Sequence, residues 1–306
     1  MSFKIPMHKN HFPSISQFAI SKVFLVIVFT VFSLVSCKEI KKAEIDLELF
    51  EAEDLALAIE NSLNSYSSDS LRGLFSPALF ARRLGSDFKQ RPKMERQYLY
   101  SIFNSLYIQN METYVEEAKL AGLEFLLFDV HMNNEVYRLN YLVTTKESEN
   151  LINYMVLYVR KDRVGDLKVA NMYSVQKGFS LAQTIKEFID ITEADSRANI
   201  KAEIANQYRE EAFYASSLGN YEKAYDLMKQ IDSKYLNTSN FAYYKVILSS
   251  KVSDSLYRSE LEWIRALTSN ESSKQFYDCM IQYINDKDDE NAIECQEKIQ
   301  EILVNY

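Results

Sequence analysis

The stretch EFLLFDVHMNNEVYRLNYLVT, from Glu124 to Thr144, decides the fold class. Its first part, Glu124–Met132, is apolar and rich in residues that favour strands. Asn133-Asn134 favours a tight turn, after which Glu135–Thr144 reads as a second strand. In this second strand, apolar and polar side chains alternate: Tyr137, Leu139, Tyr141 and Val143 against Arg138, Asn140 and Thr144. The stretch therefore predicts a β-hairpin.

The pattern continues downstream of the hairpin. Two more strand-like segments follow, Leu151–Arg160 and Asp166–Val175, with the polar residues 161–165 between them. Gly178 then breaks the pattern, and a helix is predicted from Ser180 to Ile189. Because each connection is short, the four segments predict a four-stranded antiparallel meander.

Upstream of the hairpin the pattern is helical. Apolar residues recur at helical spacing in the first helix: Ile45, Leu49, Leu55, Ile59 and Leu63. A short second helix is expected up to Phe75, with a serine cap near Ser67, and a long helix from Pro92 to Leu120. Residues 44–192 thus predict an α+β domain in which helices pack on one face of the meander. This order resembles the nuclear transport factor 2-like cone folds, partly through the helix and Ser-Pro turn at 67–77, and the resemblance implies a cavity. The interleaving of strand and helix that is usual in that family is not evident.

The segment Leu218-Gly219-Asn220-Tyr221-Glu222-Lys223-Ala224 lies in a second, purely helical region. It resembles the turn and the start of the second helix of a tetratricopeptide repeat, where a glycine makes the turn and a small alanine lets two helices approach. Ala292 follows Ala224 by 68 residues, twice the repeat period of about 34. The middle unit departs from the pattern, because Ser253 and Arg258 occupy the glycine and alanine positions.

Residues 196–306 are therefore predicted to form an all-α, tetratricopeptide-like domain of three helix pairs: 197–217 with 221–233, 239–252 with 255–268, and 272–286 with 289–303. A plain helical bundle is the alternative. The resemblance implies a concave groove that binds a protein or peptide partner. Its groove positions correspond to Arg209, Phe213, Tyr243 and Tyr277, although burial is the alternative for some of these side chains.

The amino terminus has the composition of a secretory signal. Val23–Val35 is uncharged and about 20 Å long as a helix, which is short for a bilayer, and lysines precede it. Leu34-Val35-Ser36-Cys37 resembles the lipobox of bacterial lipoproteins. The resemblance implies a signal peptide at 1–36, a lipid on Cys37 and a tether at 37–43. A plain transmembrane anchor and an ordinary signal peptide with an incidental cysteine are the alternatives. No Asp follows Cys37, so an outer-membrane lipoprotein facing the periplasm is expected.

The charge of the chain argues against nucleic-acid binding. The formal net charge is −8, and removal of residues 1–36 leaves 32 basic and 43 acidic side chains, a net charge of −11. Binding to phosphate backbones depends on clustered Lys and Arg. Basic pairs such as Arg82-Arg83 are short and are interpreted as solvated faces.

The sequence offers little catalytic chemistry. His131 is the one histidine after residue 36, and it lies two residues from Asp129, on the same face of the predicted strand. The pair could act as a base, but a structural histidine is favoured because no motif supplies a partnered nucleophile. No phosphate loop, nucleophile elbow or Cys-x-x-Cys motif occurs, so no catalytic residue, metal site or cofactor is predicted.

Two cysteines, Cys279 and Cys295, fall on the two helices of the last predicted pair. A disulfide and a pair of small buried side chains are both open. As a whole, the sequence favours a lipid-anchored, non-enzymatic protein of the cell envelope that binds a partner through its helical repeats. The alternative is a small-ligand-binding or enzymatic α+β domain for which the repeats are a scaffold.

Overall fold

The computed structural model describes residues 48–84, 86–133, 135–145, 148–193, 196–286 and 289–305. Glu51–Tyr306 make one compact unit. The predicted signal peptide, Cys37 and the tether at 37–43 lie outside the described residues. Secretion and lipid attachment therefore stay predictions.

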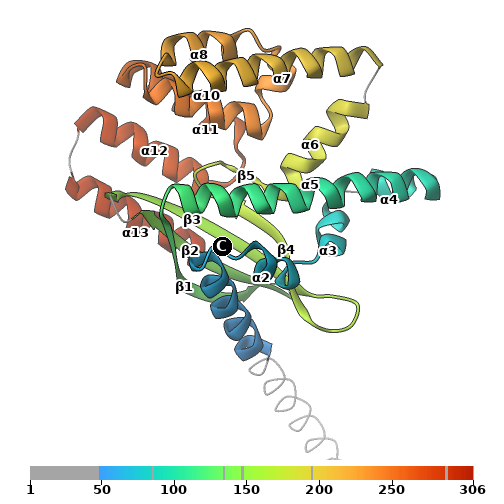
Figure 1. Cartoon of the computed structure of the whole chain (residues 1–306). Coiled ribbons are helices and arrows are strands. Elements are labelled where there is room, and N and C mark those ends of the chain that lie inside the picture. The colour runs from blue at the N-terminus through green and yellow to red at the C-terminus, as the bar shows by residue number, and fades with distance from the viewer. Residues whose placement is uncertain are drawn as a thin grey trace, which may run out of the picture. The chain divides into compact units, whose positions relative to one another are not determined.

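Helices precede the sheet, as the sequence predicts (Figure 1). They are a helix described from residue 48 to residue 64, α2 (Ser68–Leu74), α3 (Pro77–Ala81), the 3-10 helix η1 (Arg82–Leu84), α4 (Ser86–Gln90) and α5 (Lys93–Leu120). The short helices begin at serine caps, because the Ser67 and Ser76 side chains accept hydrogen bonds from the first turns of α2 and α3. Gly122, with φ +61°, follows the end of α5 and lets the chain turn into the sheet.

The sheet is antiparallel and its strands follow one another in chain order. The strands are β1 (Leu123–Asn133), β2 (Val136–Thr145), β3 (Ser148–Lys161), β4 (Leu167–Ser174) and β5 (Phe179–Ser180). The meander of β1 to β4 agrees with the prediction, but the sheet has five strands rather than four. The fifth strand contains two residues, too few for an alternating pattern to show in the sequence.

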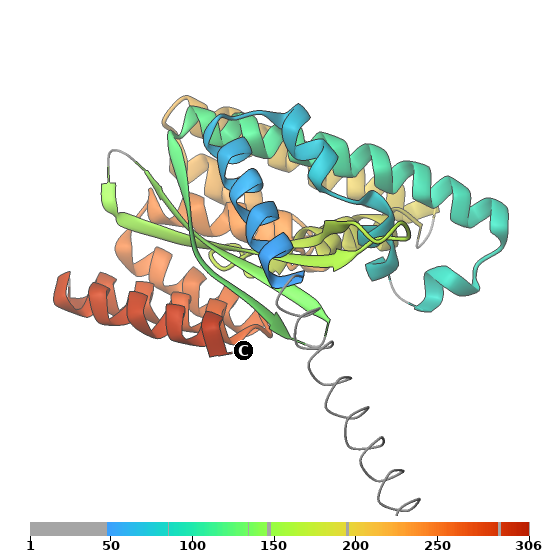
Figure 2. The same ribbon diagram turned by 90° about the horizontal axis from the view of Figure 1, so that it is seen from below.

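Helices lie against both faces of this sheet, whereas the sequence predicted helices on one face (Figure 2). On one face, the Tyr141 hydroxyl donates to the main-chain oxygen of Ala56, 2.9 Å away, in the helix 48–64. On the other face, the Tyr154 hydroxyl donates to the main-chain oxygen of Gln296, 3.4 Å away. Tyr154 is paired with Leu142, the neighbour of Tyr141, so the two tyrosines point to opposite faces.

The rest of the chain is helical: α6 (Leu181–Glu193), α7 (Ser196–Ser217), α8 (Tyr221–Lys229), α9 (Ser233–Leu236), α10 (Ser239–Ser250), α11 (Asp254–Leu267), α12 (Glu271–Asp286) and α13 (Asp289–Asn305). From α7 onward the long helices pack in chain order, with α8 against α10 and the short α9 between them in sequence (Figure 1). Gly219, with φ +75°, makes the turn after α7, and the Asn220 side chain caps α8. Most helix limits agree with those predicted, but the helix predicted at 221–233 ends at Lys229 and the short α9 was not predicted. Whether the pairs are true repeats stays a prediction.

One apolar core joins the sheet to the last helices. The strand residues Val156 and Tyr173 belong to the same buried cluster as Ala242, Ile264 and Leu303. The sequence alone does not indicate that the sheet and the C-terminal helices share a core, because the two segments are far apart along the chain. The predicted division into domains at 44–192 and 196–306 is not tested by this shared core and stays a prediction.

Candidate functional site

A cleft of about 700 Å³ lies where the second face of the sheet is not covered by helices. Strands β2, β3 and β4 form its floor. One wall comes from β5 and the start of α6, and another from the loop before α12 and the end of α13. The cleft therefore combines sheet residues with residues more than a hundred positions later in the chain.

The floor is polar because of the register of the strands. Arg138 pairs with Tyr158, and Tyr158 pairs with Asn171, so the three side chains form one row on the same face. Arg160, two residues beyond Tyr158, also points to this face and lines the cleft. The apolar half of the same face, which includes Val156, is buried under the C-terminal helices. The polar half remains open as the cleft.

Arg138 is the most buried charged group of the floor. It is 9% exposed, and its Nε–H has no hydrogen-bond partner among the described residues. Its guanidinium carbon lies 5.8 Å from the centre of the Tyr158 ring, a cation–π contact. An arginine buried to this extent usually has a carboxylate partner, since an unpaired charge is costly to bury.

Two further arginines, Arg83 and Arg160, line the cleft and are exposed to solvent. Desolvation, and next the nearby Arg160 guanidinium, lower the pKa of Arg83, while Tyr158 opposes the shift. The two guanidinium groups are therefore near enough to repel each other. Arg82 and Arg83 are both exposed, as the interpretation of a solvated face predicts, and contacts distant in the sequence also place Arg83 at the cleft.

The opposite wall is fixed by hydrogen bonds between α12 and the sheet. Ser273 Oγ donates to the main-chain oxygen of Val175, 2.6 Å away, and Tyr173 is hydrogen-bonded to the same Ser273 hydroxyl. Asn270 caps α12 by accepting from the main-chain N–H of Ser272, at 3.0 Å. These bonds hold the loop before α12, and with it Ser269 and Asn270, at the rim of the cleft.

The predicted Asp129–His131 pair forms but does not line the cleft. His131 Nδ1 is 2.6 Å from Asp129 Oδ2, and the Asn140 side-chain amide donates to the same oxygen at 2.8 Å. Among the residues that the structure describes, no Ser, Thr or Cys side chain is hydrogen-bonded to His131. Through Asn140 the pair is linked to β2, a structural role, but the buried His131 Nε2 has no hydrogen-bond partner among the described residues, so the histidine is not fully satisfied.

The four predicted groove residues do not form one surface. Tyr277 is 1% exposed, and its hydroxyl donates to the main-chain oxygen of Gln176, 2.9 Å away, so it is a core residue. Tyr243 is half-buried, and the Lys177 ammonium group lies 5.7 Å from the centre of its ring. The tetratricopeptide-like pattern does not predict the burial of these two tyrosines, because it carries no information about the sheet that packs against the helices.

The other two groove residues lie on α7. Arg209 is half-buried, with its guanidinium carbon 5.7 Å from the centre of the Phe241 ring. Phe213 is 66% exposed and Tyr214 is 68% exposed. This face of α7 thus retains aromatic surface that a partner could contact.

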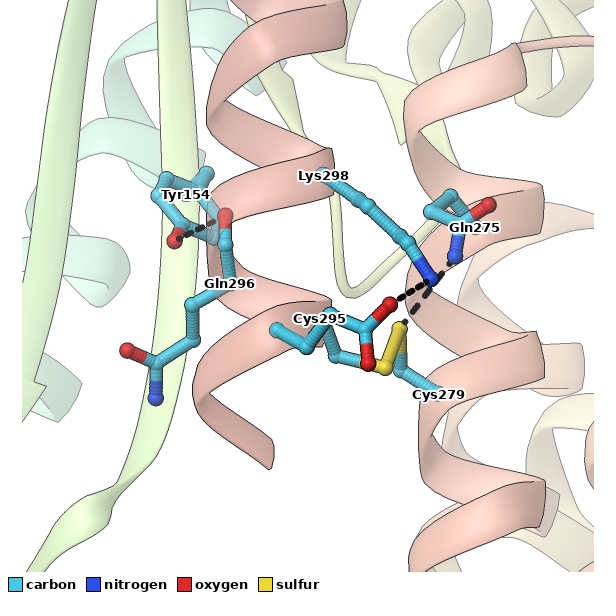
Figure 3. Close-up of a disulfide and its surroundings, with 7 residues drawn as sticks. Tyr154, Gln275, Cys279, Cys295, Gln296 and Lys298 are labelled. Carbon is cyan, nitrogen blue, oxygen red and sulfur yellow. Dashed lines mark hydrogen bonds and ion pairs between the residues drawn. A yellow bond between two sulfur atoms is a disulfide. The ribbon is translucent and has the colours of Figure 1, made fainter. Parts of the chain in front are cut away.

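Cys279 on α12 and Cys295 on α13 are joined by a disulfide, with their Cα atoms 5.7 Å apart (Figure 3). The Gln275 side-chain amide donates to Cys279 Sγ at 3.5 Å, and Lys298 forms an ion pair with Glu294 beside the bridge. The bond ties α13, whose far end lines the cleft, to α12, whose first residues form the cleft rim.

The described part of the chain contains no group of three or more His, Cys, Asp or Glu side chains that could hold a metal ion. Within the same residues, no helix is both long and apolar enough to cross a bilayer. No protein-family model matches the chain, and no curated protein or solved structure is significantly similar to it.

Sequence reasoning missed the cleft. The available signal was the recurrence of polar side chains at alternate positions of neighbouring strands, as in Arg138 and Asn140 or Tyr158 and Arg160. Placing these residues in one row requires the strand register, and a single sequence does not supply it.

Proposed function

We propose that this chain is a lipid-anchored protein of the bacterial cell envelope that binds a small ligand in the cleft without transforming it. The observation that carries the proposal is the cleft itself. Its volume of about 700 Å³ is in the range of small-molecule sites, roughly 300–1,000 Å³, and several chain segments supply its polar lining. The alternative that the sequence left open, ligand binding with the helices as scaffold, thereby becomes the leading one.

The absence of enzymatic activity is part of the proposal. The best acid–base candidate, Asp129–His131, does not line the cleft. His131 Nδ1 and one Asp129 oxygen already contact each other, and that oxygen also accepts from Asn140. A general base must reach the proton that it removes. A ligand in the cleft would therefore meet binding groups but not this pair.

The anchor is proposed from the lipobox-like sequence before Cys37. Two or three acyl chains would hold the protein stably on the outer membrane, facing the periplasm. We expect Cys37→Ser to abolish incorporation of labelled fatty acid. Cys279→Ser, which removes a cysteine outside the lipobox, is the control and should retain the label. Labelling of the Cys37→Ser protein would contradict the assignment.

The cleft can be tested by filling it. Val136 lines the floor, and a Val136→Trp substitution would occupy part of the volume. Leu120→Trp changes an exposed position on α5 and is the matched control.

Purified full-length protein would be dialysed to equilibrium against a metabolite extract of the producing cells, and the retained compounds measured by mass spectrometry. We expect at least one compound to be enriched by the native and Leu120→Trp proteins but not by Val136→Trp. Equal retention by all three, or no retention, would contradict ligand binding in the cleft.

A protein partner on the tetratricopeptide-like helices is a second candidate, favoured by the exposed Phe213 and Tyr214. A photo-crosslinking residue at position 213 should then yield a specific protein adduct in intact cells. The same residue at position 120, on α5, should not. Identical adduct patterns from both positions would count against this surface.

A further inference from the structure

We infer that the cleft takes a small organic anion, whose carboxylate or phosphoryl oxygens are bound by Arg138, Arg160 and Arg83. This assignment depends on the proposed ligand-binding function and adds the chemical class of the ligand. Arginine suits this task because its planar group offers paired N–H donors that match two oxygens of one carboxylate or phosphate.

The charge of the lining supports the assignment. The charged residues that line the cleft are three arginines and Glu271. Glu271 already forms an ion pair with Lys274, at 2.7 Å, and is thus partly neutralised. None of the three arginines forms an ion pair with a carboxylate in the part of the chain that the structure describes. The cleft is therefore a positive site in a protein whose net charge is −8.

The burial of Arg138 is a second, independent observation. More than nine-tenths of this residue is buried, and its Nε–H is unpartnered among the described residues although the residue lines the cleft. Its contact with the Tyr158 ring offsets only part of the cost of desolvating the charge. An oxyanion in the cleft would supply the counter-charge that Arg138 lacks among the described residues.

The three arginines line the cleft together with Tyr158. Arg138 contacts its ring, Arg160 follows two residues later on the same face, and Arg83 interacts electrostatically with both Arg160 and Tyr158. Neighbouring cations repel one another, so a shared anion would stabilise the arrangement.

The size of the cleft selects an organic anion over a bare inorganic ion. Its volume of about 700 Å³ far exceeds that of one phosphate ion. Apolar side chains from two sides, Val136 on β2 and Ile302 on α13, also line it. The anionic groups would therefore meet the arginines while the body of the ligand contacts these residues.

Calorimetric titration of the full-length protein in a nonionic detergent tests the inference. The probes are citrate for carboxylates, glucose 6-phosphate for phosphoryl groups, and glucose as the neutral control. We expect at least one anion to bind and glucose to bind at least tenfold more weakly.

Arg138→Gln and Arg160→Gln should each weaken anion binding by about tenfold or more, as loss of a charge-assisted hydrogen bond implies. Arg96→Gln, which removes an exposed arginine outside the cleft lining, should change it less than about twofold.

Each outcome decides a separate point. The anion that binds identifies carboxylate or phosphoryl chemistry. The inference is overturned if neither anion binds, or if Arg96→Gln weakens binding as much as the two cleft variants. Because Arg138 is buried, its variant could unfold, but Arg160 is exposed and its variant alone keeps the test decisive. If dialysis against the extract enriches a neutral compound that Val136→Trp excludes, the proposed function stands and only the anionic class fails.

Discussion

Ser273 on α12 donates its hydroxyl proton to the main-chain oxygen of Val175, 2.6 Å away at the end of β4. Since this proton is committed to Val175, the Ser273 oxygen accepts the hydrogen bond from Tyr173. One buried hydroxyl thus binds both Tyr173 on β4 and Val175, the residue that follows β4, and holds the start of α12 against the sheet.

Ser273→Ala should therefore destabilise the fold measurably. It would leave the Tyr173 hydroxyl and the Val175 oxygen without this partner, and buried unsatisfied groups cost about 1–3 kcal/mol each. Chemical denaturation would measure the loss. Ser250→Ala, at an exposed helix position where the hydroxyl contacts only its own helix, is the control and should have little effect. Equal losses for the two variants would mean that the shared hydrogen bonds contribute nothing.

A buried ion pair joins α10 to α11. Lys245 Nζ and Glu260 Oε2 are 2.7 Å apart, at an angle outside hydrogen-bond geometry, and Glu260 Oε1 accepts from the Tyr225 hydroxyl at 2.6 Å. We expect Glu260→Gln to lower the free energy of unfolding by about 3–5 kcal/mol, because it leaves Lys245 charged and buried without its counter-charge.

The control for this pair is Glu262→Gln. Glu262 forms an exposed ion pair with Arg258, at 3.2 Å, two residues along the same helix. Its loss should cost less than about 1 kcal/mol. Denaturation curves of the two variants that coincide would contradict the importance of the buried pair.

Alkaline pH should unfold the protein through its buried tyrosines. Burial raises the pKa of Tyr154 and of Tyr173 from the ordinary value of 10.0 to about 12, and hydrogen bonds with neighbouring side chains only partly oppose the shift. The folded state keeps these hydroxyls protonated where the unfolded chain loses its protons. Their contribution to stability is thus complete below pH 10.0 and is lost as the pH rises toward about 12.

Unfolding free energies measured across this range, together with tyrosinate absorbance, would check the expectation. Tyr154→Phe removes one of the shifted groups and should flatten the decline. Tyr98→Phe, at an exposed position on α5, should leave the decline unchanged. A stability that stays constant up to pH 12 would show that these hydroxyls are not buried in solution.

The disulfide should form under oxidising conditions and stabilise the protein. Cys279 and Cys295 are 16 residues apart, and a loop of this length is worth about 3 kcal/mol in the chain-entropy picture. The Cys279→Ala, Cys295→Ala double variant should unfold at correspondingly lower denaturant concentration. Alkylation under denaturing conditions, followed by mass spectrometry, should label these two cysteines only after reduction. Labelling without reductant would show that the thiols are free.

Much of the secondary structure could be predicted because its signals are local. Asn220 and Ser253 cap α8 and α11, and Gly219 marks the turn after α7, so the helix limits were readable from the sequence. The meander was readable from the alternation in β2 and from the short connections.

That helices cover both faces of the sheet was harder to predict than the secondary structure, although the sequence contains one signal of it. Four consecutive residues of β3, from Tyr154 to Leu157, are all buried. A continuous apolar run of this kind is typical of a strand buried on both faces. Which helices provide the second cover depends on contacts between segments more than a hundred residues apart, and local patterns carry no information about them.

The shared core also determines the order in which the protein can fold. Synthesis delivers the sheet first, with the apolar face around Val156 and Tyr173 uncovered. Its cover is complete only when Leu303 has emerged, since the Asn140 side-chain amide donates to the Leu303 main-chain oxygen across 163 positions of the chain. A nascent chain that stops after α6 would therefore expose this apolar face of the sheet to solvent. Until the last helix is made, we expect such a chain to be bound by chaperones that prevent aggregation.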